Sequence, residues 1–175
     1  MEIDIPPFID EIGSDGVENH RAIFIFSSEE MDIFTDGSAL ANSKRSKAGW
    51  ACYWPDLDIL RSGSMIGTNN MAELRAIDYA LWYTIEHLDP IKGLKIVIHS
   101  DSEYSINVIT GKKRSHANLE QLAKIKGHID KLKELGAELS FEHVLAHTGK
   151  TDDKSKYNDI VDKEARRQAG NAKRE

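Results

Sequence analysis

The 175-residue chain contains a single cysteine, Cys52. One cysteine excludes an internal disulfide framework, and its position within an apolar run favours a buried structural thiol over a nucleophile. The shortage of cysteine fits a reducing, intracellular compartment, either the cytoplasm or the nucleoid or nucleus. No cluster of cysteine and histidine with zinc-ligand spacing is present, so a zinc site is not expected.

Long apolar runs are also missing. No stretch approaches the ~18 consecutive apolar residues that a membrane-spanning helix requires. The amino terminus carries Glu2 and Asp4 in place of the basic region of a secretory signal. We therefore expect a protein that neither spans a membrane nor is secreted.

Positive charge is scarce at the start of the chain. The formal net charge is −6, but residues 1–31 hold eight acids and only one base, Arg21, so the remaining residues sum to +1. Local patches matter more than net charge for binding phosphates. The acidic total is therefore a weak argument against a nucleic-acid partner.

The composition divides the chain into three parts. Residues 1–30 form an acidic extension that lacks hydrophobic periodicity and is expected to be irregular, although the apolar run at 22–26 could add a strand. Residues 31–170 carry the regular patterns of one domain, and residues 171–175 form a short tail. We expect a monomer, with a protein partner as one possible ligand of the acidic extension.

Alternating and periodic patterns predict the elements of this domain. Strands are expected at 31–36, 49–57, 58–67, 94–101 and 137–147, and helices at 69–88, 102–110, 118–136 and 157–170. Asn69 or Asn70 could cap the first helix. The order, written βββαβαβα, predicts an α/β fold with a mixed five-stranded sheet and helices packed on it.

Carboxylates stand where these elements begin or end. Asp36 and Asp101 close two strands that would lie side by side, and Glu73 lies near the start of a helix that could aim at the same sheet edge. Asp162, in the last helix, is a possible fourth. Like charges this close are costly without a cation, and Mg²⁺ prefers a few carboxylates together with substrate phosphates.

Each acid also has a structural alternative. Asp36 could form a turn, Glu73 could favour the helix dipole, Asp101 could be an N-cap, and Asp162 could lie on a solvated helix face. Taken singly, these alternatives are favoured. The local sequences reverse that balance, because "DIFTDGSA", "TNNMAEL", "HSDSEY" and "AHTGK…YNDIVDKEA" occur in an order and spacing that closely resembles type 1 ribonuclease H.

The resemblance runs from about Met31 to Gln168 and implies the ribonuclease H fold. It implies that the four acids bind two Mg²⁺ ions with substrate present, with Mn²⁺ as the alternative ion. Asp162 matches the family's last acid better than Asp159, which lies three residues earlier. His147 resembles the family's flexible-loop histidine, which assists proton movement or product release. Other histidines are expected on the surface or satisfied in the core.

The resemblance also implies contacts to an RNA/DNA hybrid. The following residues match family positions that contact the ribose 2′-hydroxyl, the DNA strand or the site itself: Gly37, Ser38, Ala39, Thr68, Asn69, Asn70, Glu103, Asn118 and Asn158. Of these, Thr68 and Asn118 resemble a pocket for a DNA phosphate. The 2′-hydroxyl is the group that separates RNA from DNA at such a site.

Three departures from the family pattern concern nucleic-acid binding. Ile66 stands where many members have a phosphate-binding arginine, and Lys112 stands about where they have a tryptophan. The family's basic protrusion is missing, and only "GKKRSHAN" replaces it. Lys112, Lys113 and Arg114 could substitute through charge, or they could be a solvated loop. Hybrid binding that is weaker or altered is therefore expected.

The resemblance implies an endoribonuclease that hydrolyses the RNA strand of RNA/DNA hybrids and leaves 5′-phosphate and 3′-hydroxyl ends. Two alternatives remain. The same acids serve nucleases that act on DNA in distant relatives, and a retained fold without catalysis could bind hybrids only. The presence of all four acids argues against the last alternative.

Overall fold

The computed structural model describes residues 29–145 and 152–172, together with four short strands nearer the amino terminus. The strands are β1 (Ile3–Asp4), β2 (Ile9–Ile12), β3 (Glu18–Arg21), β4 (Phe24–Phe26), β5 (Glu30–Ala39), β6 (Lys47–Trp54), β7 (Ile59–Ile66), β8 (Leu88–Asp89), β9 (Lys95–Ser100) and β10 (Glu138–His143). The helices are α1 (Asn69–His87), α2 (Glu103–Ile109), α3 (Leu119–Glu134) and α4 (Asp153–Asn171), with a 3₁₀ turn, η1, at Pro55–Leu57.

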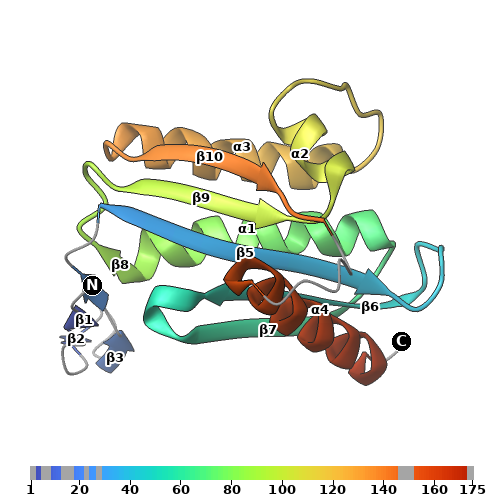
Figure 1. Cartoon of the computed structure of the whole chain (residues 1–175), viewed down its shortest axis with the longest axis horizontal. Helices are drawn as coiled ribbons and strands as arrows, with labels where there is room; N and C mark the ends of the chain where they lie inside the picture. Colours follow the sequence, from blue (N-terminus) through green and yellow to red (C-terminus); the bar gives the residue numbers. More distant parts are fainter. Residues whose placement is uncertain are drawn as a thin grey trace.

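The main sheet has the strand order β10-β9-β5-β6-β7. β9 pairs in parallel with both β5 and β10, whereas β6 pairs antiparallel with β5 and β7. Figure 1 shows α4 on one face of this sheet and α1 and α3 on the other. The predicted mixed five-stranded α/β fold is therefore confirmed, including both predicted helices between β9 and β10, α2 and α3, of which the shorthand βββαβαβα writes only one.

Alternation along β5 separates two apolar layers. Met31 and Ile33 pack into the larger core cluster with residues of α1, while Phe34 packs on the other face with Val161 and Ala165 of α4. Successive strand residues point to opposite faces, so one strand can serve both layers. β9 is also buried on both faces: Ile96 and Ile98 belong to the larger core cluster, and on the opposite face the His99 ring stacks on Phe34.

The sequence predicts that the first strand of the domain ends at Asp36, but β5 runs further. It continues to Ala39 and stays paired with β6, and Asp36 lies opposite Ala51. What ends beside Asp36 is the parallel neighbour, because the last pair between β5 and β9 is Thr35 with Ser100. Asp36 thus sits where one partner strand stops and leaves an opening at the sheet edge.

The helix starts also differ from prediction. Thr68 caps α1, and its hydroxyl accepts a hydrogen bond of 3.2 Å from the Met71 amide, in place of Asn69 or Asn70. Glu73 is the fifth residue of α1 and therefore lies beyond the first turn. Ser102, not Asp101, caps α2 with a 3.1 Å bond from the Ser105 amide. The capping and first-turn alternatives for these two acids are thereby removed.

The acidic extension contains strands where irregular structure was expected, and one of them, β4, falls within the apolar run 22–26 that could add a strand. β2 pairs with β3, and β4 pairs both with β1 and with β8, at the end of α1. The fourteen helical residues that follow Glu73, which span about 21 Å at the helical rise, separate it from Leu88 at the start of β8. In Figure 1, β8 and the carboxyl end of β9 lie at opposite ends of the molecule. The limits of the predicted domain stay a prediction.

Candidate active site

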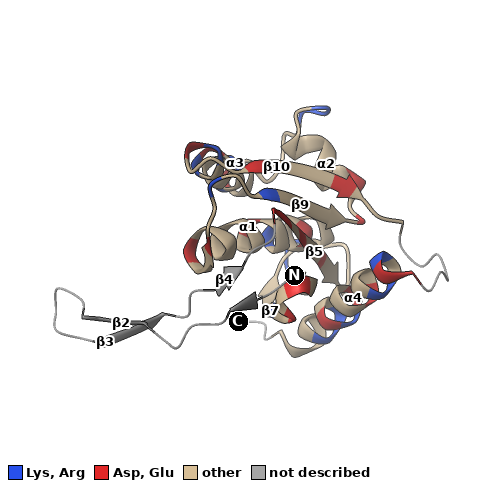
Figure 2. Ribbon diagram, turned by 60° about the vertical axis from the view of Figure 1, so that its left-hand side comes forward, with Lys and Arg blue, Asp and Glu red and all other residues tan. Residues whose placement is uncertain are grey.

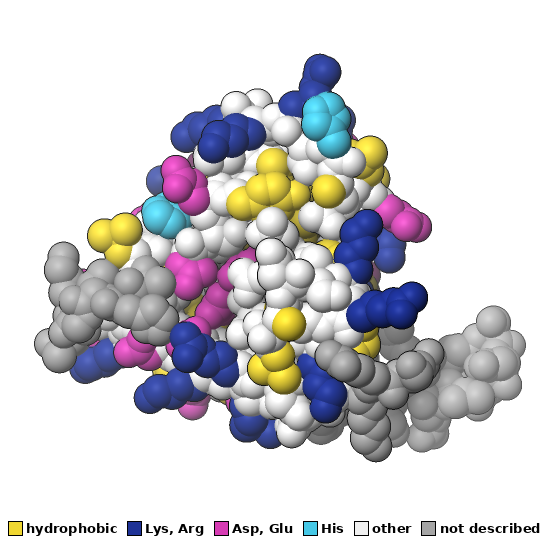
Figure 3. Space-filling model, turned by 90° about the vertical axis from the view of Figure 1, so that its right-hand side faces the viewer, with side chains coloured by type: hydrophobic (Ala, Val, Ile, Leu, Met, Phe, Trp, Pro, Cys, Tyr) yellow, Lys and Arg dark blue, Asp and Glu magenta, His cyan; other side chains and the backbone are white. Residues whose placement is uncertain are grey.

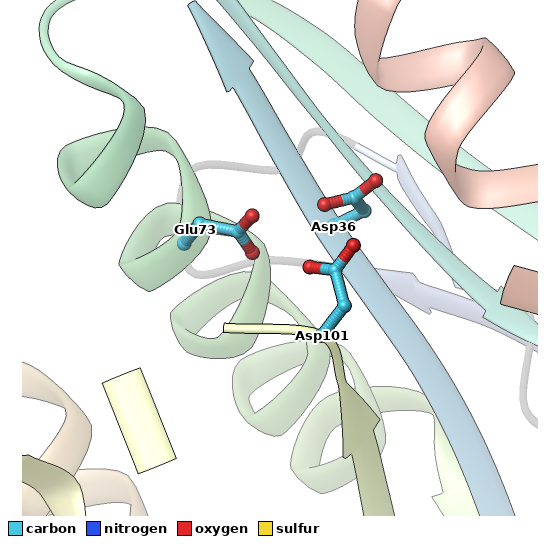
Figure 4. Close-up of side chains that lie close together, drawn as sticks. All are labelled: Asp36, Glu73 and Asp101. Atoms are coloured by element: carbon cyan, nitrogen blue, oxygen red, sulfur yellow. The ribbon is translucent and has the colours of Figure 1, made fainter. Parts of the chain in front are cut away.

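Three carboxylates converge at the carboxyl end of β9. Asp36, Glu73 and Asp101 each offer an oxygen, and these oxygens lie within 4.8 Å of one another. They come from three elements: Asp36 from β5, Glu73 from α1 and Asp101 from the residue after β9. Figure 4 shows the three side chains turned toward one another in the space between α1 and the two strands. Among the described residues, no other group of this kind was found.

Gly37 allows Glu73 to reach this space. A β-carbon on Gly37 would stand 2.2 Å from the backbone nitrogen of Glu73 and 2.3 Å from the carbonyl carbon of Ala72. α1 therefore crosses β5 closer than any side chain at position 37 permits. The Gly37 amide also donates a 2.9 Å hydrogen bond to Oδ1 of Asp36. One glycine thus positions two of the three acids.

The acids are buried together. Asp36 and Glu73 are each only 3% exposed, and Oε2 of Glu73 is buried without a hydrogen-bond partner among the described residues. Burial, followed by the negative charges of Asp36 and Asp101, raises the pKa of Glu73 well above its usual value. Burial and then the charge of Asp101 raise the pKa of Asp36 in the same direction. A cation would remove this repulsion.

Asp101 is more accessible than the other two acids. Its pKa is also raised, first by burial and then by the charge of Asp162, while the nearby His143 acts in the opposite direction. The ring of His143 lies 3.2 Å from the main-chain oxygen of Asp101, measured from Nε2. From the sequence alone, His143 is expected to be an ordinary surface or core histidine. The parallel register that places His143 beside Ser100 was the signal that could have found it.

Asp162 lies near the three acids but outside their group. Its Oδ1 accepts a 3.1 Å bond from Nε of Arg166, and its side chain is 18% exposed. Its charge nonetheless raises the pKa of both Asp36 and Asp101. Asp159, in contrast, is exposed. The geometry therefore favours Asp162 over Asp159 as the acid of α4 that faces the site.

Asn158 is buried next to this region. It is 4% exposed, and its Oδ1 has no hydrogen-bond partner among the described residues. It lines a 160 Å³ cavity together with His143, the last residue of β10, and Leu145, which follows that strand. His147 lies outside the described residues, so its predicted role is not examined by the structure.

The residues predicted to contact nucleic acid come from β5, from α4 and from the starts of α1, α2 and α3. Ser38 and Ala39 follow Asp36 on β5, and the Ala39 amide donates to Oδ1 of Asn69 at 3.3 Å. Asn69 and Asn70 are the first two residues of α1, and both are exposed. Glu103, the first residue of α2, is exposed as well.

Thr68 and Asn118 are half-buried. Asn118 precedes α3, and its amide donates to the hydroxyl of Tyr104 at 3.2 Å. Thr68 is already engaged as the cap of α1. Thr68 and Asn118 therefore each bond to another residue of the chain, in addition to their predicted contact with a DNA phosphate.

Two features outside the site agree with sequence-based expectations. Cys52 is fully buried, and its thiol donates to the carbonyl oxygen of Ala76 at 3.0 Å, as expected of a structural cysteine. His99 lies in the core as expected, 2% exposed with its Nε2 2.7 Å from Asp32, but it is only partly satisfied, because its Nδ1 is buried without a hydrogen-bond partner among the described residues. No helix within the described part of the chain is long and apolar enough to cross a membrane.

Three acids thus gather where β9 ends beside β5 in a mixed sheet, an arrangement that could hold a metal ion, and comparison with known proteins specifies the class of the chain. The RNase H family model matches residues 28–170. The chain therefore belongs to the RNase H family, as the sequence motifs predicted.

Individual relatives agree with this family. A ribonuclease H from Tropheryma whipplei (strain Twist) is 42% identical over 84 residues, which is 48% of this chain and 48% of that protein. A probable ribonuclease H of Acanthamoeba polyphaga mimivirus is 34% identical over 101 residues, or 50% of this chain and 42% of that protein. The matched regions thus span about half the length of these relatives.

Solved structures share the fold. RNase H1 from the archaeon Halobacterium salinarum NRC-1 superposes with a TM-score of 0.56 at 23% identity, covering 82% of this chain and 99% of that one. LC11-RNase H1, solved in complex with an RNA/DNA hybrid, gives a TM-score of 0.58 at 19% identity, covering 81% of this chain and 97% of that one. At these identities the likeness concerns the fold.

Proposed function

We propose that the chain is a metal-dependent endoribonuclease that hydrolyses the RNA strand of RNA/DNA hybrids. The observation that carries this proposal is the acid cluster of Asp36, Glu73 and Asp101 at the carboxyl end of β9 in an RNase H fold. The named relatives are ribonucleases H, and one structural neighbour was solved with a hybrid.

The residues fit a hard divalent cation. The site offers only carboxylate oxygens, which are the ligands that Mg²⁺ prefers. The orphaned Oε2 of Glu73 and the raised pKa values of Asp36 and Asp101 are the signs of a site whose charge is not compensated by the protein itself. These three acids would hold the metal, with Asp162 as a fourth ligand. Mn²⁺ meets the same requirements.

When bound, two Mg²⁺ ions would activate a water and stabilise the leaving oxygen, giving 5′-phosphate and 3′-hydroxyl ends. The chain's own residues fix the acids in place. The Gly37 amide orients Asp36, and the close crossing of α1 over β5 sets the position of Glu73. His147 would accept or release a proton near the attacking water, a role that suits the titration range of histidine.

Selection of RNA is assigned to groups around the acids. A ribose 2′-hydroxyl would meet hydrogen-bond donors and acceptors from the main chain at Gly37, Ser38 and Ala39. The side chain of Asn69 and the start of α2 at Glu103 would supply further ones. A DNA strand lacks that hydroxyl and would leave them unpaired. Asn158 would support the same end of the site from α4.

The DNA strand is assigned to the opposite side. Asn70, Thr68 and Asn118 are the proposed contacts, and the loop after α2 adds the exposed Lys112, Lys113 and Arg114. Figure 2 shows basic residues at the tip of this loop, above α2. With Ile66 in place of an arginine, charge from this loop would have to compensate, so binding should depend strongly on salt.

The acidic extension is assigned to another role. Because β4 pairs with β8 at the end of α1 that is distant from Glu73, its attachment does not place it over the acids. A protein partner is therefore favoured over masking of the site. The enzyme is proposed to act as a monomer, because all four acids come from one chain.

The deciding experiment is cleavage of a labelled RNA/DNA hybrid in Mg²⁺ by the purified protein and by Asp101→Asn. Single-stranded RNA, duplex RNA and duplex DNA serve as control substrates. We expect metal-dependent cutting of the hybrid's RNA strand that the substitution abolishes. Cutting of duplex DNA alone would indicate a DNA nuclease on this fold. Hybrid binding without cutting in Mg²⁺ or Mn²⁺ would indicate a non-catalytic binding protein.

A further inference from the structure

A basic hairpin loop lies on the same side of the molecule as the acids. Residues 40–46 connect β5 to β6, directly beyond Gly37, Ser38 and Ala39. Lys44 and Arg45 are both exposed in this loop. Three residues of strand, or about 10 Å, separate Asp36 from the start of the loop. The hairpin loop therefore projects from the edge of the candidate active site.

The loop is braced by its own hydrogen bonds. Ser46 is 1% exposed, and its hydroxyl accepts a 2.8 Å bond from the Ala41 amide and donates to the Lys47 carbonyl at 3.1 Å. The Ser46 carbonyl accepts a 2.8 Å bond from the amide of Gly67, the residue that precedes the cap of α1. The Arg45 amide bonds to the Ser43 hydroxyl at 3.2 Å. Backbone groups and the hydroxyls of Ser43 and Ser46 make these bonds, and the side chains of Lys44 and Arg45 take no part in them.

The charges of the hairpin loop are not neutralised within the described part of the chain. Neither Lys44 nor Arg45 has a carboxylate within ion-pair distance there, whereas several cations elsewhere do. On α4, for example, Arg166 pairs with Asp162 at 3.1 Å and Arg167 with Glu164 at 2.6 Å. In Figure 2 basic and acidic residues mix along α4. Two unpaired cations on a fixed loop suit an external anion.

The surrounding face has the same character. Figure 3 shows the side of the molecule on which β9 ends, where a strip of acidic side chains lies in a hollow, with Lys and Arg side chains below it and farther out on the same face. One helical turn of a duplex is about 34 Å long. A single turn centred on the acids would therefore extend about 17 Å to either side of them. The hairpin loop falls within that reach.

We propose that Lys44 and Arg45 contact backbone phosphates of the duplex bound at the acid site. This inference rests on the proposed function, because it takes the hybrid as the ligand. The contacts are to phosphates and not to bases, so they add affinity without adding sequence preference. Together with the loop after α2, they would place basic residues on two sides of the acids.

The test compares two double variants of equal charge change. The first variant, Lys44→Gln with Arg45→Gln, removes the two cations of the hairpin loop. The control variant, Lys92→Gln with Lys95→Gln, removes two exposed lysines near the start of β9. Asp101 follows the other end of that strand. Hybrid binding and cleavage are measured for both variants and the wild type between 50 and 200 mM salt. Duplex DNA is measured in parallel, and circular dichroism checks the fold.

Each phosphate contact contributes about 0.9 to the slope of log affinity against log salt. We expect the hairpin variant to lose between about one and two from this slope for both duplexes, with kcat at saturating hybrid unchanged. The control variant should match the wild type. If the wild type binds and cleaves hybrid while both variants keep its slope, the hairpin contact is refuted and the proposed function stands. If the wild type neither binds nor cleaves hybrid, both proposals fail.

Discussion

Gly37 of β5 and Glu73 of α1 are in contact through their backbones, with room for no side chain between them. A β-carbon at Gly37 would lie 2.2 Å from the Glu73 nitrogen, whereas real contacts of this kind essentially never fall below 3.0 Å. The position of Glu73 in the acid cluster thus depends on a residue that bears no functional group. This dependence can be tested separately from the chemistry of the acids.

Gly37→Ala should displace α1 and with it Glu73. Overpacking of this kind costs about 1–3 kcal/mol of unfolding free energy, and hybrid cleavage should fall sharply because the acids no longer converge. Gly127→Ala is the matched control, since a β-carbon there meets nothing within 4 Å. Because Gly127 lies within α3, Gly127→Ala should raise the free energy of unfolding by about 0.5–1 kcal/mol and leave hybrid cleavage unchanged. Equal activity in both variants would contradict the proposed role of Gly37.

Stability without metal should fall as pH rises, because of Glu73. Its folded-state pKa is raised by burial and by Asp36 and Asp101, so the folded protein binds this proton more tightly than the unfolded chain does. The loss begins near the ordinary carboxyl value of about 4 and continues until the raised pKa is passed. Chemical denaturation in EDTA at pH 5 to 8 measures it.

Glu73→Gln supplies the comparison for this pH dependence. The amide cannot ionise and can donate to the Asp36 carboxylate, so the variant should be more stable than the wild type at pH 8 and closer to it at pH 5. Each unit by which the pKa is raised corresponds to about 1.4 kcal/mol of this difference. A difference that does not change with pH would show that Glu73 does not titrate as described.

Asp162→Asn should weaken metal binding and cleavage, whereas Asp159→Asn should leave both unchanged. The two residues lie on the same helix, but Asp162 is 18% exposed and acts electrostatically on Asp36 and Asp101. Asp159 is exposed to solvent. Mg²⁺ titration followed by calorimetry, with hybrid cleavage at saturating metal, separates the two. The reverse result would assign the fourth acid to Asp159.

His147→Ala should lower kcat by about 100-fold and leave hybrid affinity nearly unchanged, because general acid–base assistance contributes about that much. The acidic limb of the pH–rate profile should also be lost. His116→Ala, which removes an exposed histidine from the loop before α3, is the control. If both variants keep the wild-type profile, His147 has no part in proton transfer.

The sequence predicted the fold well because its patterns were long and regular. The apolar run of β9 and the helical period of α1 are signals that burial on both faces of a strand or one face of a helix imposes. The convergence of Asp36 and Asp101 followed from the parallel pairing of their strands. The acids could thus be found without coordinates.

The details that prediction missed depend on tertiary neighbours. β5 runs past Asp36 because β6 continues to pair with it after β9 has ended, and no local pattern records that. Thr68 caps α1 in place of Asn69, although both residue types are good caps. His143 reaches Asp101 through strand register alone. In the acidic extension, β4 falls within the apolar run 22–26 that could add a strand, whereas β1, β2 and β3 depend on pairing with other strands and not on a hydrophobic period.

The single buried cysteine has a practical consequence for measurement. Cys52 is 0% exposed, its thiol is bonded to the Ala76 carbonyl, and burial raises its pKa well above the usual value. A thiol held this way is a poor target for maleimide reagents, which react with accessible thiolates. Ser43→Cys on the hairpin loop would therefore accept a fluorophore selectively in the otherwise native sequence. Energy transfer to a dye on the hybrid could then report docking in real time.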